Sequence, residues 1–382
     1  MSALFQNYAR RPFAIVEGKG TEVFDTTGKR YLDFTSGIAV CSLGHANPAI
    51  VEAIQQQSEK LWHISNLFES PGQEKLAASL VKDLHLSYAF FCNSGAEANE
   101  AAIKLARKHT GKHKIIVFEQ SFHGRTFGAM SATGQDKVRN GFGPLVSEFI
   151  TLPFNDVDAL KAAADSETAA IMLEMIQGEG GVNSVSDEFA QAIHDIQQST
   201  DILVIADEVQ TGIGRTGTRF AFEQTVIKPN IVSMAKGLGG GFPIGGILGT
   251  EELFNTFNAG THGTTFGGNP LAVSVAQTVI DHIFNDEFLQ SVKQKSSYFV
   301  NKLKEAFPNY TVQGKGLMLG LGLGGEDVAP YVAALDKAGL LTVAAGPKVI
   351  RLLPPLTVSE QEIDEAVDIL KGVLQTNKIT TP

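Results

Sequence analysis

The sequence predicts an α/β fold with a mostly parallel central sheet in a large domain, followed by a smaller α+β domain. Apolar runs of strand length alternate with amphipathic segments of helix length, which is the pattern of βα units. After residue 284 the pattern changes to long helices and short, glycine-spaced strands. We therefore expect an N-terminal segment (1–41) that packs with the small domain, a large domain (42–270) and a C-terminal small domain (271–382).

The predicted strands of the large domain are continuous runs rich in Val, Ile and Phe. Such runs lack the alternation of a half-exposed strand and indicate strands that are buried on both faces. Helices are expected between them, one of them opened by Ser94 as its N-cap. The predicted strands are Tyr88–Cys92, Lys114–Phe118, Ala169–Ile176, Ile202–Ala206, Asn230–Met234 and Pro243–Leu248, and the helices are Ala96–His109 and Glu188–Ser199.

The C-terminal part is expected to consist mainly of helices around a few short strands. The strands lie in the stretch GKGLMLGLGLGG, where glycines separate short apolar runs. The last helix begins at Ser359, which forms a capping box with Glu362 ahead of several apolar positions. The other predicted helices are Asn269–Phe284, Glu287–Phe307 and Asp327–Ala338.

Composition excludes several classes of protein. The chain has 382 residues, of which 43% are hydrophobic, and a net charge of -10, which argues against a surface for nucleic acid or anionic lipid. Its two cysteines form no C-x-x-C pair, and with the nine histidines they show no spacing typical of zinc, so no metal site is expected. The first apolar stretch stops at Glu17 and is too short for the core of a signal peptide. We expect a cytoplasmic protein.

One lysine stands in unusual surroundings. The stretch SMAKGLGGGFPIGG places Lys236 among six glycines and otherwise apolar or small residues. An ammonium group without a partner in such a setting costs several kcal/mol or loses its proton. The sequence therefore predicts that Lys236 carries a neutral, nucleophilic amine.

Other polar residues follow the predicted strands. Asp207 comes directly after an apolar strand, at the end where open α/β sheets bind ligands, although a helix cap or an ion pair with Arg215 would also explain it. Ser94 and Gly95 lead into a helix whose free N–H groups form an anion site, although such a turn can merely cap a helix. A ligand with a phosphate, a protonatable ring nitrogen, a flat face and an aldehyde would use an anion site, an acid, an aromatic residue such as Phe122 and a neutral lysine.

That ligand is pyridoxal 5'-phosphate (PLP), and the chain resembles the class III aminotransferases of the PLP-dependent fold-type-I superfamily. The resemblance extends nearly from end to end. It rests on the ordered motifs SGIAVCSLGHANP, NSGAEANEAAIKLAR, FHGRTFGAMSATG, EMIQGEGG, IADEVQTGIGRTG, the lysine segment, HGTTFGGNPLA and IRLLPPL.

The resemblance implies roles for individual residues. Lys236 would bind PLP covalently, and Asp207 would keep the pyridine nitrogen protonated, so that the ring accepts electrons. Thr265 would reach the phosphate from the partner subunit of a homodimer. The remaining cofactor contacts would come from Ser94, Gly95, Ala96, Phe122, Val209 and Gln210, and the substrate contacts from Arg125, Thr264, Glu179 and Arg351.

Within the family, the sequence is most similar to the subgroup that transfers the side-chain amine of N2-acetyl-L-ornithine to 2-oxoglutarate in arginine biosynthesis, by a ping-pong mechanism. Enzymes acting on ornithine, succinylornithine or 4-aminobutyrate are the alternatives. Ile38 stands where the ornithine enzymes have a tyrosine that binds the free α-amine, which favours an acetylated donor. Ala96 replaces a threonine found in many relatives, and Met175 a proline.

Three rival functions remain less well supported. Two G-x-G-x-x-G matches, one at 212–217 and one at 320–325, would fit a nicotinamide dehydrogenase, but neither has the acidic residue expected about twenty positions later. A PLP-dependent mutase or decarboxylase would keep the cofactor residues but not the set Arg125, Thr264 and Arg351. A non-catalytic binding protein would have no use for the lysine.

Overall fold

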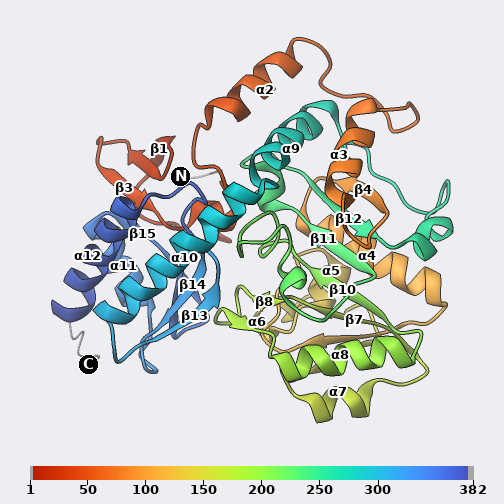
Figure 1. Cartoon of the computed structure of the whole chain (residues 1–382). Helices are drawn as coiled ribbons and strands as arrows, with labels where there is room; N and C mark the ends of the chain where they lie inside the picture. The colour runs from red at the N-terminus through yellow and green to blue at the C-terminus, as the bar shows by residue number, and fades with distance from the viewer. Residues whose placement is uncertain (1–2, 377–382) are drawn as a thin grey trace.

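The computed structural model describes residues 3–376, and its largest element is a seven-stranded sheet (Figure 1). Every strand runs in the same direction except β12, which is antiparallel to both of its neighbours. The mostly parallel central sheet is therefore confirmed. In spatial order the strands are β4 (Tyr88–Cys92), β12 (Gly245–Gly249), β11 (Ile231–Met234), β10 (Leu203–Asp207), β7 (Thr168–Leu173), β5 (Lys114–Phe118) and β6 (Phe149–Leu152).

Helices cover both faces of this sheet, which explains the continuous apolar runs. Ile115 and Val117 of β5 belong to a cluster with the buried side of α4 (Gly95–Thr110). Their neighbours Ile116 and Phe118 face a second cluster that includes α8 (Asp187–Ser199). The further helices of this region are α1 (Ser36–Ala39), α2 (Pro48–Ser58), α3 (Pro71–Val81), α5 (Phe127–Ala132), α6 (Asp136–Arg139), α7 (Val157–Ala163) and α9 (Pro270–Ile283), with 3-10 helices η1 (Ala221–Gln224), η2 (Lys236–Gly239) and η3 (Glu251–Thr256).

The predicted strand Ala169–Ile176 is wrong in its extent. β7 ends at Leu173, and a separate short hairpin follows, made of β8 (Ile176–Gln177) and β9 (Asn183–Ser184). Between them stands Glu174, whose carboxylate accepts the backbone N–H groups of Phe122, at 3.1 Å, and Gly178, at 3.2 Å. The Glu174 side chain thus ends the strand and anchors the turn after it.

The C-terminal part forms a separate antiparallel sheet with the strand order β13-β14-β17-β16, flanked by helices. The predicted capping box is confirmed, because Ser359 Oγ accepts the N–H of Glu362 at 3.2 Å and the Glu362 carboxylate accepts the N–H of Ser359 at 2.7 Å. The elements are α10 (Asp286–Ala306), β13 (Thr311–Lys315), β14 (Met318–Gly322), α11 (Ala329–Ala338), β15 (Leu340–Leu341), β16 (Val343–Ala345), β17 (Val349–Leu352) and α12 (Glu360–Thr376).

The N-terminal strands lie against this C-terminal part, at the left of Figure 1. The strands β1 (Ile15–Lys19), β2 (Glu22–Asp25) and β3 (Arg30–Asp33) form an antiparallel meander, and β3 pairs in parallel with β15. Chain segments about 300 residues apart therefore share one sheet. The domain limits at residues 42 and 271 remain a prediction.

Neither glycine motif has the context that a dinucleotide requires, which is a strand, a tight turn and a helix. Residues 212–217 lie in a loop of turns after β10, and Gly320 and Gly322 are inside the antiparallel strand β14.

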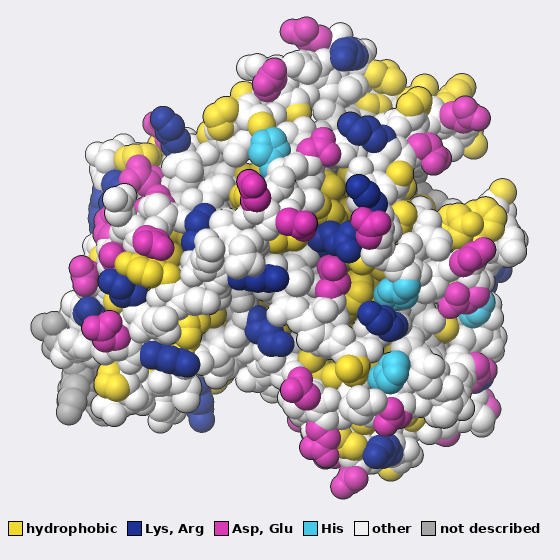
Figure 2. Space-filling model, in the orientation of Figure 1, with side chains coloured by type: hydrophobic (Ala, Val, Ile, Leu, Met, Phe, Trp, Pro, Cys, Tyr) yellow, Lys and Arg dark blue, Asp and Glu magenta, His cyan; other side chains and the backbone are white. Residues whose placement is uncertain are grey.

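In the face shown in Figure 2, acidic and basic side chains are interspersed. None of the helices in residues 3–376 combines the length and apolar composition of a membrane span.

Candidate active site

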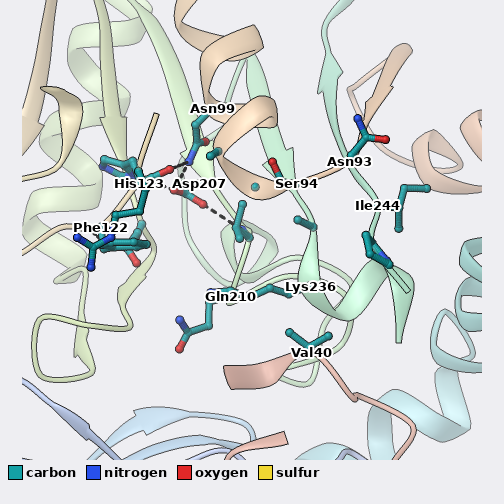
Figure 3. Close-up of a pocket in the computed structure, with 18 of the residues that line it drawn as sticks. Val40, Asn93, Ser94, Asn99, Phe122, His123, Asp207, Gln210, Lys236 and Ile244 are labelled. Atoms are coloured by element: carbon teal, nitrogen blue, oxygen red, sulfur yellow. Dashed lines mark hydrogen bonds and ion pairs between the residues drawn. The ribbon is translucent and has the colours of Figure 1, made fainter. Parts of the chain in front are cut away.

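A cavity of about 410 Å³ opens where the strands β4, β5, β7, β10 and β11 end (Figure 3). Parallel strands bring the residues that follow them to one edge of the sheet, which is where open α/β sheets bind ligands. Ten of the thirteen predicted site residues line the cavity, namely Ser94, Gly95, Ala96, Phe122, Arg125, Glu179, Asp207, Val209, Gln210 and Lys236.

Lys236 begins the 3-10 helix η2, two residues after β11 ends. Its φ of 44° is uncommon for a residue with a side chain and indicates that the surrounding glycine segment holds it in place. Within residues 3–376 no hydrogen bond or ion pair engages its amine. Burial and the positive charge of Arg351 lower the pKa of Lys236, which favours the neutral amine that the sequence predicts.

Asp207, at the end of β10, is held by three donors. Its Oδ2 atom accepts Asn99 Nδ2 at 2.8 Å and lies 2.7 Å from His123 Nδ1, and Oδ1 accepts the N–H of Val209 at 3.0 Å. The alternative of an ion pair with Arg215 is therefore wrong. Burial alone would lower the pKa of His123, but the hydrogen bond and the charge of Asp207 raise it. The Asp207 carboxylate is thus fixed in orientation and faces the cavity.

His123, Asn99 and Glu174 are site residues that sequence reasoning did not assign. All three line the cavity. Ser233 Oγ donates to Asn99 Oδ1 at 2.6 Å, so the amide is oriented with its nitrogen toward Asp207. Burial raises the pKa of Glu174 to about 7, and the charge of Asp207 adds to this rise while that of His123 opposes it. The sequence did contain one signal for this part of the site, because Asn99 is a polar residue on the buried side of a predicted helix.

The N-terminus of α4 forms one end of the cavity. Ser94 is its N-cap, as predicted, and Ser94 Oγ accepts the N–H of Glu97 at 3.2 Å. The N–H groups of Gly95 and Ala96, in the first turn of the helix, have no partner within the helix. A Cβ atom at Gly95 would lie 2.7 Å from Val209 Cγ1, so only glycine allows this approach of α4 to the loop after β10.

Aromatic and basic side chains form another wall. Phe122 is partly buried, and the guanidinium of Arg125 lies 5.5 Å from the centre of its ring. Arg125 is exposed, so its charge can meet a ligand that enters from solvent.

Arg351 does not line the cavity but contacts two residues that do. Its guanidinium is buried and lies 2.7 Å from Glu179 Oε1, and it donates to Gln210 Oε1 at 2.9 Å and to the carbonyl of Gly178 at 2.8 Å. The ion pair therefore closes the cavity on the side of the C-terminal sheet, where Arg351 belongs to β17.

Thr264 and Thr265 lie outside the cavity of their own chain. Thr264 Oγ1 accepts Asn93 Nδ2 at 3.2 Å, and Thr265 is exposed. Ile38 does not line the cavity either, and it is 38% exposed, whereas Val40 from the same segment does line it. The expectation that Ile38 faces the donor's α-amino group is not met within one chain.

The cavity fits the parts of PLP. Its volume suits a small cofactor, the turn at Ser94 offers N–H groups to a phosphate, and Phe122 with Val209 can hold a flat ring. Asp207 can accept a hydrogen bond from a protonated ring nitrogen, and Lys236 offers an amine without a partner among the described residues. The described residues of the cavity thus match the phosphate, the flat ring, the ring nitrogen and the aldehyde of PLP.

The fold and this cavity define a PLP-dependent transferase of fold type I. The chain belongs to the class III aminotransferases, because the model of the family described as aminotransferase class-III matches residues 5–374. It is 53% identical over 378 residues to the acetylornithine aminotransferase of Halalkalibacterium halodurans, with 98% of each chain covered.

Solved structures agree with this assignment. The N-acetylornithine aminotransferase of Stenotrophomonas maltophilia has a TM-score of 0.83 and 36% identity, with 97% of each chain covered. The ornithine aminotransferase of Toxoplasma gondii, which holds PLP at partial occupancy in its active site, has a TM-score of 0.92 and 30% identity, with 97% of this chain and 92% of that chain covered. The predicted family, fold class and cofactor are confirmed.

Proposed function

We propose that this chain is a cytoplasmic acetylornithine aminotransferase that transfers the side-chain amino group of N2-acetyl-L-ornithine to 2-oxoglutarate, giving N-acetylglutamate 5-semialdehyde and glutamate. The product would serve arginine biosynthesis. The observation that carries the chemistry is the amine of Lys236, unpaired among the described residues, in the same cavity as the anchored carboxylate of Asp207. The near full-length identity to an acetylornithine aminotransferase supports the choice of donor.

PLP, when bound, supplies a ring that accepts the electron pair released at the substrate carbon. Lys236 is the residue that we propose to bind its aldehyde carbon and then, once freed, to take the proton from the substrate carbon and deliver it to that cofactor carbon. Asp207 would hold a proton on the pyridine nitrogen, and His123 and Asn99 keep the Asp207 carboxylate in place.

The other cavity residues bind and orient. Ser94, Gly95 and Ala96 would hold the phosphate at the N-terminus of α4. Phe122 and Val209 would pack on the two faces of the ring. Gln210 would donate its amide nitrogen to the ring hydroxyl, since its Oε1 already accepts a hydrogen bond from Arg351. Arg125 and Thr264 would bind the donor's carboxylate.

A homodimer would complete the site, with Thr265 reaching the phosphate of the partner subunit. The exposed position of Thr265 outside its own cavity supports this arrangement. A group of exposed apolar residues also supports a dimer. It lies next to Thr265 and in the segment between α2 and α3, and apolar surface of this kind is usually covered by a partner. These residues are Trp62, 65% exposed, Leu67, 90%, Phe68, 62%, and Phe266, 60%.

One cavity must accept two substrates, and the ion pair of Glu179 with Arg351 offers a way. We propose that the pair stays closed for the amine donor and opens for 2-oxoglutarate, whose carboxylate then takes the place of Glu179 on the guanidinium. The two planar groups can form two parallel hydrogen bonds, which lysine cannot reproduce.

Arg351→Lys is therefore expected to raise the KM for 2-oxoglutarate at least about tenfold and to change the KM for the amine donor much less. Steady-state kinetics with each substrate varied in turn measure both constants. Arg30→Lys is the matched control, because Arg30 pairs with Glu22 and Glu365 on the exposed surface. Equal changes in the two KM values would contradict the opening of the pair.

The donor itself is tested by comparing efficiencies. Ornithine presents a charged α-amine, whereas N2-acetylornithine presents a neutral amide. In the segment that contains Ile38, the apolar residue that lines the cavity is Val40. Burying an ammonium group without a partner costs a few kcal/mol. We expect a kcat/KM for N2-acetylornithine at least about a hundredfold above that for ornithine, from roughly 3 kcal/mol of discrimination. A preference for ornithine, succinylornithine or 4-aminobutyrate would assign the chain to another subgroup.

A further inference from the structure

The loop after β10 contains the glycine motif at residues 212–217, to which the proposed transamination gives no role. The buried carboxylate of Glu208 holds the start of this loop to its end, because it accepts the N–H of Phe222 at 2.8 Å and the hydroxyl of Thr211. The loop is therefore held as one unit, and this unit includes Gln210.

Arg215, inside the glycine motif, is a buried cation. It is 1% exposed. Its Nε and Nη2 atoms find no hydrogen-bond partner, and its guanidinium finds no ion-pair partner, among residues 3–376. Burying a cation in this way costs several kcal/mol, and an apolar side chain of similar size would fill the same space without that cost. Packing alone therefore does not explain an arginine at this position.

The third nitrogen of Arg215, Nη1, binds the C-terminal sheet. It donates to the carbonyl of Leu317 at 3.0 Å and to the carbonyl of Pro354 at 2.6 Å. The N–H of Leu317 in turn donates to the carbonyl of Arg215 at 2.9 Å. A Cβ atom at Gly316 would overlap the same carbonyl oxygen, so the turn between β13 and β14 lies directly against the loop. Three hydrogen bonds thus join the loop after β10 to the sheet.

Both acceptors lie close to Arg351, the residue that we propose to bind 2-oxoglutarate. Leu317 directly precedes β14, and Pro354 comes two residues after the end of β17. The two strands pair, with Gly320 of β14 opposite Arg351 of β17. Arg351 connects the same parts in the other direction, because it donates to Gln210 of the loop at 2.9 Å. Two arginines, one from each side, therefore connect the loop with this pair of strands.

The two arginines differ in whether their partners can leave. Arg351 pairs with Glu179, whose side chain is 32% exposed and can turn to solvent when a substrate carboxylate arrives. Arg215 donates to backbone carbonyls, which have no such freedom, and its burial keeps a substrate away from it. The contacts of Arg215 can therefore persist while the pair of Arg351 with Glu179 is open.

We propose that Arg215 is a positioning residue for the second substrate, which keeps Arg351 in place beside Gln210 while the ion pair of Arg351 with Glu179 is open. A group that binds a substrate needs such support to keep its geometry. The inference rests on the proposed function, in which Arg351 binds the carboxylate of 2-oxoglutarate. The first half-reaction should depend on Arg215 much less, because Glu179 then holds Arg351.

The test replaces Arg215 with methionine, which removes the hydrogen bonds without leaving a buried charge. Arg215→Met should raise the KM for 2-oxoglutarate at least about tenfold and change the rate of the half-reaction with N2-acetylornithine less than about twofold. Arg215→Lys, which can still donate to a carbonyl, should give a KM between those of the wild type and of Arg215→Met. Arg219→Met is the matched control and should keep the wild-type KM, because Arg219 lies in the same loop but donates to the carbonyl of Lys82 and pairs with Glu223.

Gly316→Ala disturbs the same contact from the side of the sheet and keeps the proposal testable if Arg215→Met does not fold. Gly316 has a φ of 61°, and the added methyl group would press the turn away from the carbonyl of Arg215. The KM for 2-oxoglutarate should rise as in Arg215→Met. Gly324→Ala is the control, because Gly324 has a φ of 65° but no atom within 4 Å of the added methyl group. It introduces the same backbone strain without the contact and should keep the wild-type KM.

Binding of glutarate, an unreactive dicarboxylate, to the PLP-loaded enzyme provides a readout without turnover. Calorimetry should show a Kd at least about tenfold higher in Arg215→Met and in Gly316→Ala than in their controls. A folded variant of either kind with the wild-type KM and Kd, or with equal losses in the two half-reactions, would overturn the role of Arg215 alone. A wild-type enzyme that cannot use 2-oxoglutarate would instead overturn the proposed function, and this inference with it.

Discussion

Lys236→Ala is expected to lower turnover by at least roughly 10⁴-fold, because one amine would serve both as the covalent anchor of PLP and as the acid and base of the proton transfer. The variant should still bind PLP, since the contacts at Ser94, Phe122 and Asp207 remain. Turnover with N2-acetylornithine and 2-oxoglutarate measures the first effect, and equilibrium dialysis of PLP measures the second.

Two further observations separate this role from a structural one. Borohydride reduction of the wild-type enzyme should fix PLP to the peptide that contains Lys236, and reduction of the variant should fix it to no peptide. Lys302→Ala is the matched control, because Lys302 pairs with Asp364 far from the lysine loop in sequence and should leave activity unchanged. Wild-type turnover in Lys236→Ala, or PLP fixed to another lysine, would refute the assignment.

Asp207→Asn is expected to slow the reaction by some hundreds-fold to thousands-fold. The amide has the shape of the carboxylate but not its charge, so it cannot keep a proton on the pyridine nitrogen. A lost interaction of about 3 to 5 kcal/mol in the transition state corresponds to a rate change of this size. The rate of a single half-reaction with N2-acetylornithine is the appropriate measurement, because it excludes effects on the second substrate.

Asp207→Glu is the matched control for charge. It keeps the carboxylate but moves it by one methylene group away from Asn99 and His123, which hold the native side chain at 2.8 and 2.7 Å. We expect an activity between those of the wild type and of Asp207→Asn. Near-normal activity in a folded, PLP-loaded Asp207→Asn enzyme would show that the charge is not required.

The central sheet could be predicted from sequence because its strands are buried on both faces. β5 and β4 lie at their predicted limits. A short, continuous apolar run such as KIIVF is typical of a strand that is covered by helices on both faces of a sheet. β6 and the N-terminal strands β1 to β3 were not predicted. They are short and partly exposed, and pairing with distant segments, such as β3 with β15, stabilises them.

The site was predictable where one residue type implied one kind of chemistry. Lys236 and Asp207 interrupt apolar surroundings, and the structure brings them to one cavity. The partners of Asp207 were not predicted, because His123 lies 84 residues away in sequence and contacts it only through the order of the strands. The sequence predicted Ile38 as a wall of the cavity, but Val40 lines it instead. The backbone is irregular here, with φ angles of 47°, 66° and 62° at Ser36, Ile38 and Ala39, so the direction of each side chain could not be read from the sequence.

The most direct test of the proposed function is a panel of half-reactions without an oxo acid. The PLP-loaded enzyme is mixed with N2-acetylornithine, succinylornithine, ornithine or 4-aminobutyrate, and the absorbance band of the bound cofactor is followed. We expect N2-acetylornithine to bleach the band fastest, and 2-oxoglutarate to restore it with formation of glutamate. A band that is bleached fastest by another donor, or by none of the four, would contradict the assignment of this chain as an acetylornithine aminotransferase.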